Sequence, residues 1–297
     1  MSKELGLDLW IKRDDLTGFA MGGNKGRKLE YLLAEAQAHR DPVVVTCGAA
    51  QSNFVRQLGA ACAVAGLECV AAVMDLPYED APASGARLRS DSGNVVLDRI
   101  LGVELVHLPD GPWETLYDHA EAIAQRLEAE GRDVYRVPIG GSSALGAYAF
   151  YEAAREIPDD FDWIVTASSS GSTQTGLAYA FHETRTMVLG ICSDPEPEIA
   201  GDFADLGYKL AELLSLPFSL SPLTFSLSFD FVGPGYGIPS QEGDAAIERL
   251  ARAEGIFLDP IYSGKAFAAL IALAERREIR GKVLFWHTGG LPTLFAR

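Results

Sequence analysis

The sequence has few cysteines and no long hydrophobic run. Only four cysteines, Cys47, Cys62, Cys69 and Cys192, occur among 297 residues, without a CxxC pair and without metal-like spacing to the five histidines. We interpret them as reduced core thiols. No apolar run approaches the roughly 20 residues that a membrane span requires, and residues 1–6 lack a signal-peptide core. We therefore expect a cytoplasmic protein that uses neither a metal nor a membrane.

Positive charge is also scarce. Lys and Arg total 25 against 41 Asp and Glu, so the formal net charge is −16. The phosphates of a nucleic acid would be repelled, and we expect no such partner. A negative net charge still permits a local basic pocket for one phosphate group. At this length the chain can form one large α/β unit or two coupled lobes, each with a core.

Short runs of β-branched residues alternate with helical patterns. We expect strands at 42–46, 70–73, 103–108, 163–166, 187–192 and 283–286, and helices at 51–65, 113–130, 172–183 and 198–215. Near-continuous apolar strands between helices are typical of parallel sheets covered on both faces. This predicts an open α/β fold rather than a sandwich. The polar stretch 75–94 is expected to be a surface loop, and 217–243 a bridge across the face that carries the site.

Lys25 follows two glycines and begins a predicted helix. In Gly22-Gly23-Asn24-Lys25 the amine can project from the helix start into a cleft, where the helix dipole and Lys28 lower its pKa. A lysine on a solvated helix face is the alternative. The segment is not a P-loop, because no glycine lies five residues ahead of a Gly-Lys pair.

Two further turns join a predicted strand to a helix. Residues 168–176 (SSSGSTQTG) present small residues and backbone N–H groups suited to an anion, and phosphate is the favoured occupant. A polar loop without a ligand is the alternative, and a nucleotide site has no GxGxxG or GxxxxGK to support it. In the other turn, Gln51-Ser52-Asn53, Ser52 either binds a carboxylate or caps the helix.

Two tyrosines stand in glycine-containing turns near the C-terminus. Tyr236 lies within 233–239 (GPGYGIP) and Tyr262 within 259–265 (DPIYSGK). A hydroxyl that reaches a cleft can shuttle a proton or orient a carboxylate. A packed aromatic ring with one satisfied O–H is the alternative for each. We interpret His287, in a third such turn, as structural.

Together these segments resemble the family of 1-aminocyclopropane-1-carboxylate (ACC) deaminases and D-cysteine desulfhydrases, which use pyridoxal 5'-phosphate (PLP). The matching segments are 11–15 (IKRDD), 22–25 (GGNK), 51–53 (QSN), 171–174 (GSTQ), 235–239 (GYGIP), 258–262 (LDPIY) and 287–290 (HTGG). They span nearly the whole chain. The resemblance implies a two-lobed α/β fold with parallel-sheet lobes, the tryptophan synthase β-like fold (PLP fold type II). It places a large PLP-binding lobe at 1–27 and 136–297 and a small lobe at 28–135, and it suggests a homodimer.

The resemblance also implies a role for each motif. Catalytic roles fall to Lys25, Ser52, Tyr236 and Tyr262: Lys25 carries PLP as a Schiff base, Ser52 binds or activates the substrate, and the tyrosines lie over the cofactor. The remaining PLP contacts are Lys28, Ser170, Gly171, Ser172 and Thr173 at the phosphate, Asn53 at the ring oxygen, and Ser263 and Thr288 near the pyridine nitrogen.

The implied reaction is a β-elimination on a small β-substituted amino acid, as in D-cysteine desulfhydrases. The Lys25 amine or a tyrosine takes the Cα proton, the leaving group (sulfide from cysteine) departs, and pyruvate and ammonia follow. Ser263 stands where ACC deaminases have a Glu that keeps the pyridine protonated, which favours elimination over cyclopropane opening.

A further departure from the family pattern, at position 54, leaves the substrate open. Phe54 stands where desulfhydrases have His and deaminases Gln. L-cysteate sulfo-lyase and ACC deaminase therefore stay as alternatives, and a PLP-binding protein without turnover is an alternative of another class. The chain opens just before Leu9, so we expect the family's first strand and its Thr-Pro-Leu segment to be missing.

Overall fold

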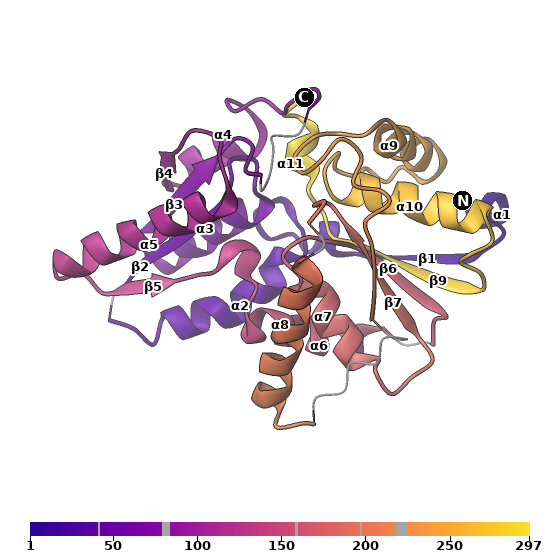
Figure 1. Cartoon of the computed structure of the whole chain (residues 1–297), viewed down its shortest axis with the longest axis horizontal. Helices are drawn as coiled ribbons and strands as arrows, with labels where there is room; N and C mark the ends of the chain where they lie inside the picture. Colours follow the sequence, from indigo (N-terminus) through magenta and orange to yellow (C-terminus); the bar gives the residue numbers. More distant parts are fainter. Residues whose placement is uncertain (41, 79–83, 158–159, 197, 218–224) are drawn as a thin grey trace.

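The chain forms two parallel sheets, seen in a computed structural model that describes residues 1–40, 42–78, 84–157, 160–196, 198–217 and 225–297 (Figure 1). The four-stranded sheet has the order β4-β3-β2-β5, built from β2 (Val43–Ala49), β3 (Cys69–Met74), β4 (Glu104–His107) and β5 (Val134–Arg136). The five-stranded sheet has the order β1-β9-β6-β7-β8, built from β1 (Asp8–Arg13), β6 (Trp163–Ser168), β7 (Met187–Cys192), β8 (Phe225–Ser228) and β9 (Lys282–His287). The predicted open α/β class with parallel sheets is confirmed.

Helices cover both faces of the sheets. They are α1 (Ser2–Leu5), α2 (Lys25–Ala36), α3 (Asn53–Ala65), α4 (Gly93–Ile100), α5 (Trp113–Ala129), α6 (Ala144–Ala153), α7 (Ser172–Ala180), α8 (Ile199–Leu214), α9 (Gln241–Glu254), α10 (Ser263–Glu275) and α11 (Leu291–Leu294). In Figure 1, α9 and α10 lie on one side of the large sheet and α6 to α8 on the other. Strands β2 and β3 are buried at every position because both of their faces are covered. No helix in the described ranges is long and apolar enough to cross a bilayer.

The six expected strands all form, and three others were not predicted. β1 is an edge strand whose residues are exposed or half-buried, β5 has only three residues, and β8 lies at the other edge. Such strands lack the continuous apolar run that marks a central strand. Of the two polar stretches, residues 79–83 and 218–224 lie outside the described residues. The remainder of the first stretch leads into α4, and that of the second holds β8 and the Tyr236 turn.

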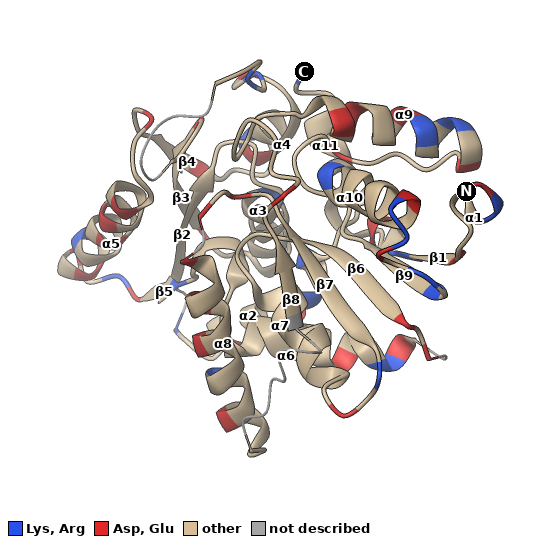
Figure 2. Ribbon diagram, turned by 45° about the vertical axis from the view of Figure 1, so that its right-hand side comes forward, with Lys and Arg blue, Asp and Glu red and all other residues tan. Residues whose placement is uncertain are grey.

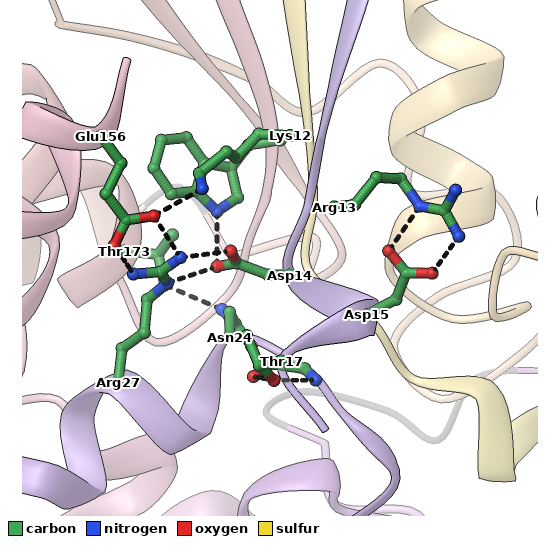
Figure 3. A network of polar contacts seen from close by, with 11 residues as sticks. Lys12, Arg13, Asp14, Asp15, Thr17, Asn24, Arg27, Glu156 and Thr173 are labelled. Atoms are coloured by element: carbon green, nitrogen blue, oxygen red, sulfur yellow. Dashed lines mark hydrogen bonds and ion pairs between the residues drawn. The ribbon is translucent and has the colours of Figure 1, made fainter. Parts of the chain in front are cut away.

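A buried ionic network anchors the segment that precedes α2 (Figure 3). Asp14 is fully buried and accepts two hydrogen bonds from Arg27, at 2.8 and 2.9 Å, and one from the indole N–H of Trp286 at 2.7 Å. Arg27 also donates to Glu156, which Lys12 contacts as well. The hydrogen bonds from Arg27 lower the pKa of Glu156 to about 2. The start of α2 is thereby tied to β1, β9 and the end of α6.

The turn between this network and Lys25 requires glycine at position 22. Its φ is +74°, and a Cβ there would lie 1.9 Å from the carbonyl oxygen of Asp15. The next two amides are also fixed, since Gly23 donates to the carbonyl of Asp14 at 2.8 Å and Asn24 to that of Thr288 at 3.0 Å. The position of Lys25 is therefore determined by backbone contacts on both sides of the turn.

We predict that Gly22→Ala destabilises the protein far more than Gly18→Ala. Gly18 has a similar φ of +78°, but nothing lies within 4 Å of its Cβ position, so its cost is the left-handed strain of about 1 kcal/mol. Gly22→Ala adds a backbone collision and should cost at least about 3 kcal/mol. Urea unfolding of both variants measures the difference. Equal losses would show that the collision is relieved by a shift of the turn.

Candidate functional site

The carboxyl ends of both sheets face one cavity of about 960 Å³. Turns that follow β2, β6, β7 and β9 all line it, as expected where parallel strands end together. Nine of the twelve site residues predicted from the sequence are at its surface: Lys25, Ser52, Asn53, Ser170, Gly171, Thr173, Tyr236, Tyr262 and Thr288. The structure thus brings together residues that are up to 263 positions apart.

Lys25 and Lys28 lie one helical turn apart at the start of α2. Lys25 borders the cavity, whereas Lys28 is fully buried behind it and donates to the carbonyl oxygen of Gly140 at 2.9 Å. Burial lowers the pKa of Lys25 to about 8, partly offset by its hydrogen bond with Lys28. Burial and the adjacent Lys25 charge lower the pKa of Lys28 well below its ordinary value. The Lys25 amine is therefore a neutral nucleophile at mildly alkaline pH.

The start of α7 and a second glycine loop form a cradle beside these amines. Gly171, with φ +93°, precedes the helix and has no side chain to cap it, and the Ser172 amide of the first turn donates to Ser142 Oγ at 3.4 Å. Facing it is the loop at 139–142, where the Ser142 hydroxyl donates to Ser170 Oγ at 2.8 Å or Ser172 Oγ at 3.0 Å. A Cβ at Gly140 would lie 2.3 Å from Ser170 Oγ. Glycine there lets the two loops approach closely enough to surround a small anion.

Ser52 and Asn53 sit at the start of α3 on the small-sheet side of the cavity. The Ser52 hydroxyl caps the helix by accepting from the amides of Phe54 and Val55, at 3.2 and 3.3 Å, and it also borders the cavity. The position of Ser52 is therefore compatible both with capping the helix and with binding a carboxylate. The side-chain oxygen Oδ1 of Asn53 accepts from Arg56 at 3.0 Å and from Asn94 at 2.9 Å, so its side-chain nitrogen Nδ2 is the group left to donate to a ligand.

The hydroxyl oxygens of Tyr236 and Tyr262 are 2.8 Å apart. Burial is the main cause that raises both pKa values, and the pKa of Tyr236 lies well above 10. The Tyr236 ring is held edge-on against Trp113 at 5.2 Å between centroids. Behind the turn, the buried Lys265 amine donates to the carbonyl of Gly235 at 2.9 Å. The two tyrosines therefore present protonated hydroxyls to the cavity from a turn supported on its inner side.

Three predicted residues are not at the cavity surface. Lys28 supports the 139–142 loop, and Ser172 is buried at the start of α7 against Ser142. Ser263 is also buried; its hydroxyl donates to Asp259 Oδ2 at 2.5 Å and accepts from the Asp259 amide at 2.8 Å. The expected place of Ser263 near a pyridine nitrogen stays a prediction.

The sequence reasoning missed three sets of lining residues. Ser142 belongs to a Gly-Gly-Ser-Ser run, a signal that was visible in the sequence. Ser168, the last residue of β6, was included in the predicted 168–176 loop but was given no contact; it lies two positions before Ser170, the first residue assigned to phosphate. Acidic residues between 194 and 205 form the third set, described below. The ring of His287 hydrogen-bonds with backbone groups of Phe257 and Gly289, in accordance with a structural role.

The residues at the cavity fit PLP. A half-buried amine with a depressed pKa can form the covalent link, and the start of α7 behind Gly171 can receive the phosphate. The Oγ atom of Ser168 is buried at the cavity without a hydrogen-bond partner among the described residues, as expected where a polar ligand completes the site. Asn53 and Thr288 add further polar groups to the lining of the cavity.

Comparison with known proteins reveals close relatives over the full length. The chain is 40% identical to a D-cysteine desulfhydrase from Serratia proteamaculans and 40% identical to one from Yersinia enterocolitica; each alignment covers 100% of this chain and 90% of the relative. Its structure matches a crystal structure of an ACC deaminase homologue with a TM-score of 0.88 and 35% identity, covering 99% of this chain and 88% of the other.

More distant structures share the fold. Threonine deaminase isoform 2 from Solanum lycopersicum matches with a TM-score of 0.59 and 16% identity, over 97% of this chain and 76% of that one. The sequence profile of the family described as pyridoxal-phosphate dependent enzyme matches residues 1–289. The chain belongs to this family of PLP-dependent enzymes.

Proposed function

We propose that this enzyme catalyses β-elimination on a small β-substituted amino acid, D-cysteine foremost, and releases pyruvate, ammonia and sulfide. The observation that carries the proposal is the Lys25 amine, whose pKa of about 8 places a nucleophile in the cavity between an anion cradle and two tyrosine hydroxyls. The two relatives named D-cysteine desulfhydrase, aligned over the whole chain, support it.

Each part of the cavity has a role in binding. Backbone amides of residues 170–173 would hold the phosphate, and Lys28 supports the facing loop through its hydrogen bond to the Gly140 carbonyl. The Asn53 amide donates to the phenolic oxygen of the ring, and the Ser52 hydroxyl, which accepts from the helix, donates its own proton to the substrate carboxylate. Bound PLP supplies the electron sink that makes the Cα proton acidic.

The pKa shifts favour Lys25 as the base. Tyr236 and Tyr262 hold their protons at neutral pH because burial raises their pKa, so they act as donors. The Lys25 amine, with its pKa of about 8, would in its neutral form accept the Cα proton. We assign the tyrosine pair to the departing sulfur, which needs a proton as its bond to Cβ breaks.

We also propose a cytoplasmic homodimer whose large lobe comprises 1–27 and 136–297 and whose small lobe comprises 28–135. The four cysteines are buried free thiols, which suits a reducing compartment. The lobe assignment is supported by the sheets, since β2 to β5 lie between residues 43 and 136. The dimer rests on the family resemblance, and sedimentation of the purified protein tests it.

Covalent attachment of PLP should depend on the ionisation of Lys25. Because the folded-state pKa is lowered to about 8, the neutral amine predominates above that pH, and the rate of attachment to the apoprotein should rise with a midpoint near 8 rather than 10.5. Stopped-flow absorbance between pH 6.5 and 9.5 measures it. Lys25→Ala should show no borohydride-stable label, whereas Lys209→Ala should retain it. Labelling of the Lys25→Ala protein at another lysine would refute the assignment.

The holoenzyme should convert D-cysteine to pyruvate, sulfide and ammonia in equal amounts. ACC should give little or no α-ketobutyrate, since a hydroxyl stands at position 263. Parallel assays with D-cysteine, L-cysteine and ACC make this comparison. Faster turnover of ACC than of either cysteine would replace the proposed elimination with ring opening, and a PLP-loaded protein that is inactive on all three would favour a binding role.

Tyr262→Phe should lower kcat on D-cysteine by about a hundredfold or more, since general acid–base groups contribute roughly 10²–10⁴. The absorbance of the bound cofactor should persist, because the covalent link is made by Lys25. Tyr151→Phe is the matched control, as Tyr151 packs against Tyr148 and Tyr179 outside the cavity. A kcat for Tyr262→Phe equal to that of the control would remove the tyrosine from proton transfer.

A further inference from the structure

One wall of the cavity is acidic. Six carboxylate residues line the cavity (Glu114, Asp194, Glu196, Glu198, Asp202 and Asp205), against two lysines, Lys25 and Lys209. Asp194 is buried and Glu196 half-buried, whereas the other four are exposed at the rim. Figure 2 shows the acidic positions that recur along α8, the helix that forms part of this wall. None of these carboxylates has a role in the elimination described above.

The deepest part of the wall adjoins a hydroxyl that lacks a partner. Ser168 is 3% exposed, and its Oγ has no hydrogen bond within the described ranges although it borders the cavity. It pairs in register with Cys192 of β7, and the Ser193 amide donates to its carbonyl at 3.0 Å. Asp194 follows directly. A polar ligand group placed here would reach both the hydroxyl and the acidic wall.

This wall also faces the tyrosines. The charge of Asp194 contributes to the raised pKa of both Tyr236 and Tyr262. The carboxylates also act on one another: burial, followed by Asp194, raises the pKa of Glu196 to about 8, opposed by its contact with Trp113. A substituent that leaves toward the tyrosine pair therefore enters a region where negative charge is already unfavourable.

We propose that Asp194 and Glu196, together with Ser168, restrict the substrate to amino acids whose β-substituent is neutral or cationic. The inference rests on the proposed elimination and narrows its substrate class. A thiol or an ammonium group is accepted, and a sulfonate, phosphate or carboxylate is rejected by charge repulsion. Lys209 does not make the wall positive. It is exposed, and it lies four and seven residues after Asp205 and Asp202 on the same face of the same helix, where these carboxylates offset its charge.

Ligand binding to the PLP-loaded protein tests the inference separately from turnover. Spectral titration with alanine, 2,3-diaminopropionate and aspartate compares neutral, cationic and anionic β-substituents of small size. We expect aspartate to bind at least about tenfold more weakly than alanine at low salt, and 2,3-diaminopropionate to bind no more weakly than alanine. Both enantiomers of each amino acid are used.

Variants of the acidic wall test whether Asp194 and Glu196 cause the weaker binding of an anionic β-substituent. At pH 9, where Glu196 with its pKa of about 8 is ionised, Glu196→Gln and Asp194→Asn should each reduce the ratio of the aspartate and alanine dissociation constants by about threefold to tenfold. Glu212→Gln, the same charge change at an exposed position of α8 outside the cavity, should leave that ratio unchanged. Because Asp194 is buried, its variant is the one at risk of misfolding; the half-exposed Glu196 keeps the test decisive.

Two outcomes would overturn the inference. One is binding of aspartate as tight as that of alanine; the other is a ratio of the aspartate and alanine dissociation constants that is the same in Glu196→Gln and in Glu212→Gln.

Turnover is measured separately from binding, with 3-chloroalanine, D-cysteine and cysteate as substrates and pyruvate as product. If no substrate yields pyruvate while the binding order holds, the proposed elimination fails and the charge selection stands. Rapid turnover of cysteate would overturn the selection and leave the elimination intact.

Discussion

The burial of two lysine amines side by side is the constraint on which the site depends. An ammonium group loses its hydration when it is buried, so the pKa of both Lys25 and Lys28 is lowered. Lys28 recovers part of this cost through the Gly140 carbonyl. That contact ties the 139–142 loop to α2, and glycine at position 140, with φ of +62°, lets the loop approach Ser170. The cradle for an anion is a consequence of accommodating the amines.

Lys25 also has to be held between two sheets that belong to different parts of the chain. The Asp14–Arg27 network fixes the turn to the large sheet. From the other side the buried Arg56 of α3 donates to the backbone carbonyl of Gly22 at 3.1 Å and to the side-chain Oδ1 of Asn53 at 3.0 Å. One arginine thereby couples the turn that positions the amine to the asparagine assigned to the cofactor. A change in the relative placement of the sheets would disturb both contacts together.

The sequence could predict which segments meet, but not where each side chain points. Motifs at the carboxyl ends of strands converge because parallel strands end together, and this brought nine of twelve predicted residues to the cavity. Lys28 and Ser263 do not reach the cavity because each forms a hydrogen bond away from it. Lys28 donates to a carbonyl of a loop distant in sequence, and Ser263 donates to Asp259, four residues earlier. Short or edge strands, such as β5 and β1, have too little apolar pattern to be recognised.

The acidic wall shows that amino-acid composition cannot predict where charged side chains lie in the structure. A net charge of −16 describes the whole surface, and the carboxylates at 194–205 are indistinguishable in sequence from solvated surface residues. The field of so acidic a protein opposes the approach of a phosphate or an amino-acid carboxylate. Affinity for these anions must then come from short-range contacts, the amides of the 170–173 turn and the amines at 25 and 28. The same cavity can therefore hold an anionic cofactor on one side and exclude an anionic substituent on the other, because each effect acts over a few ångströms.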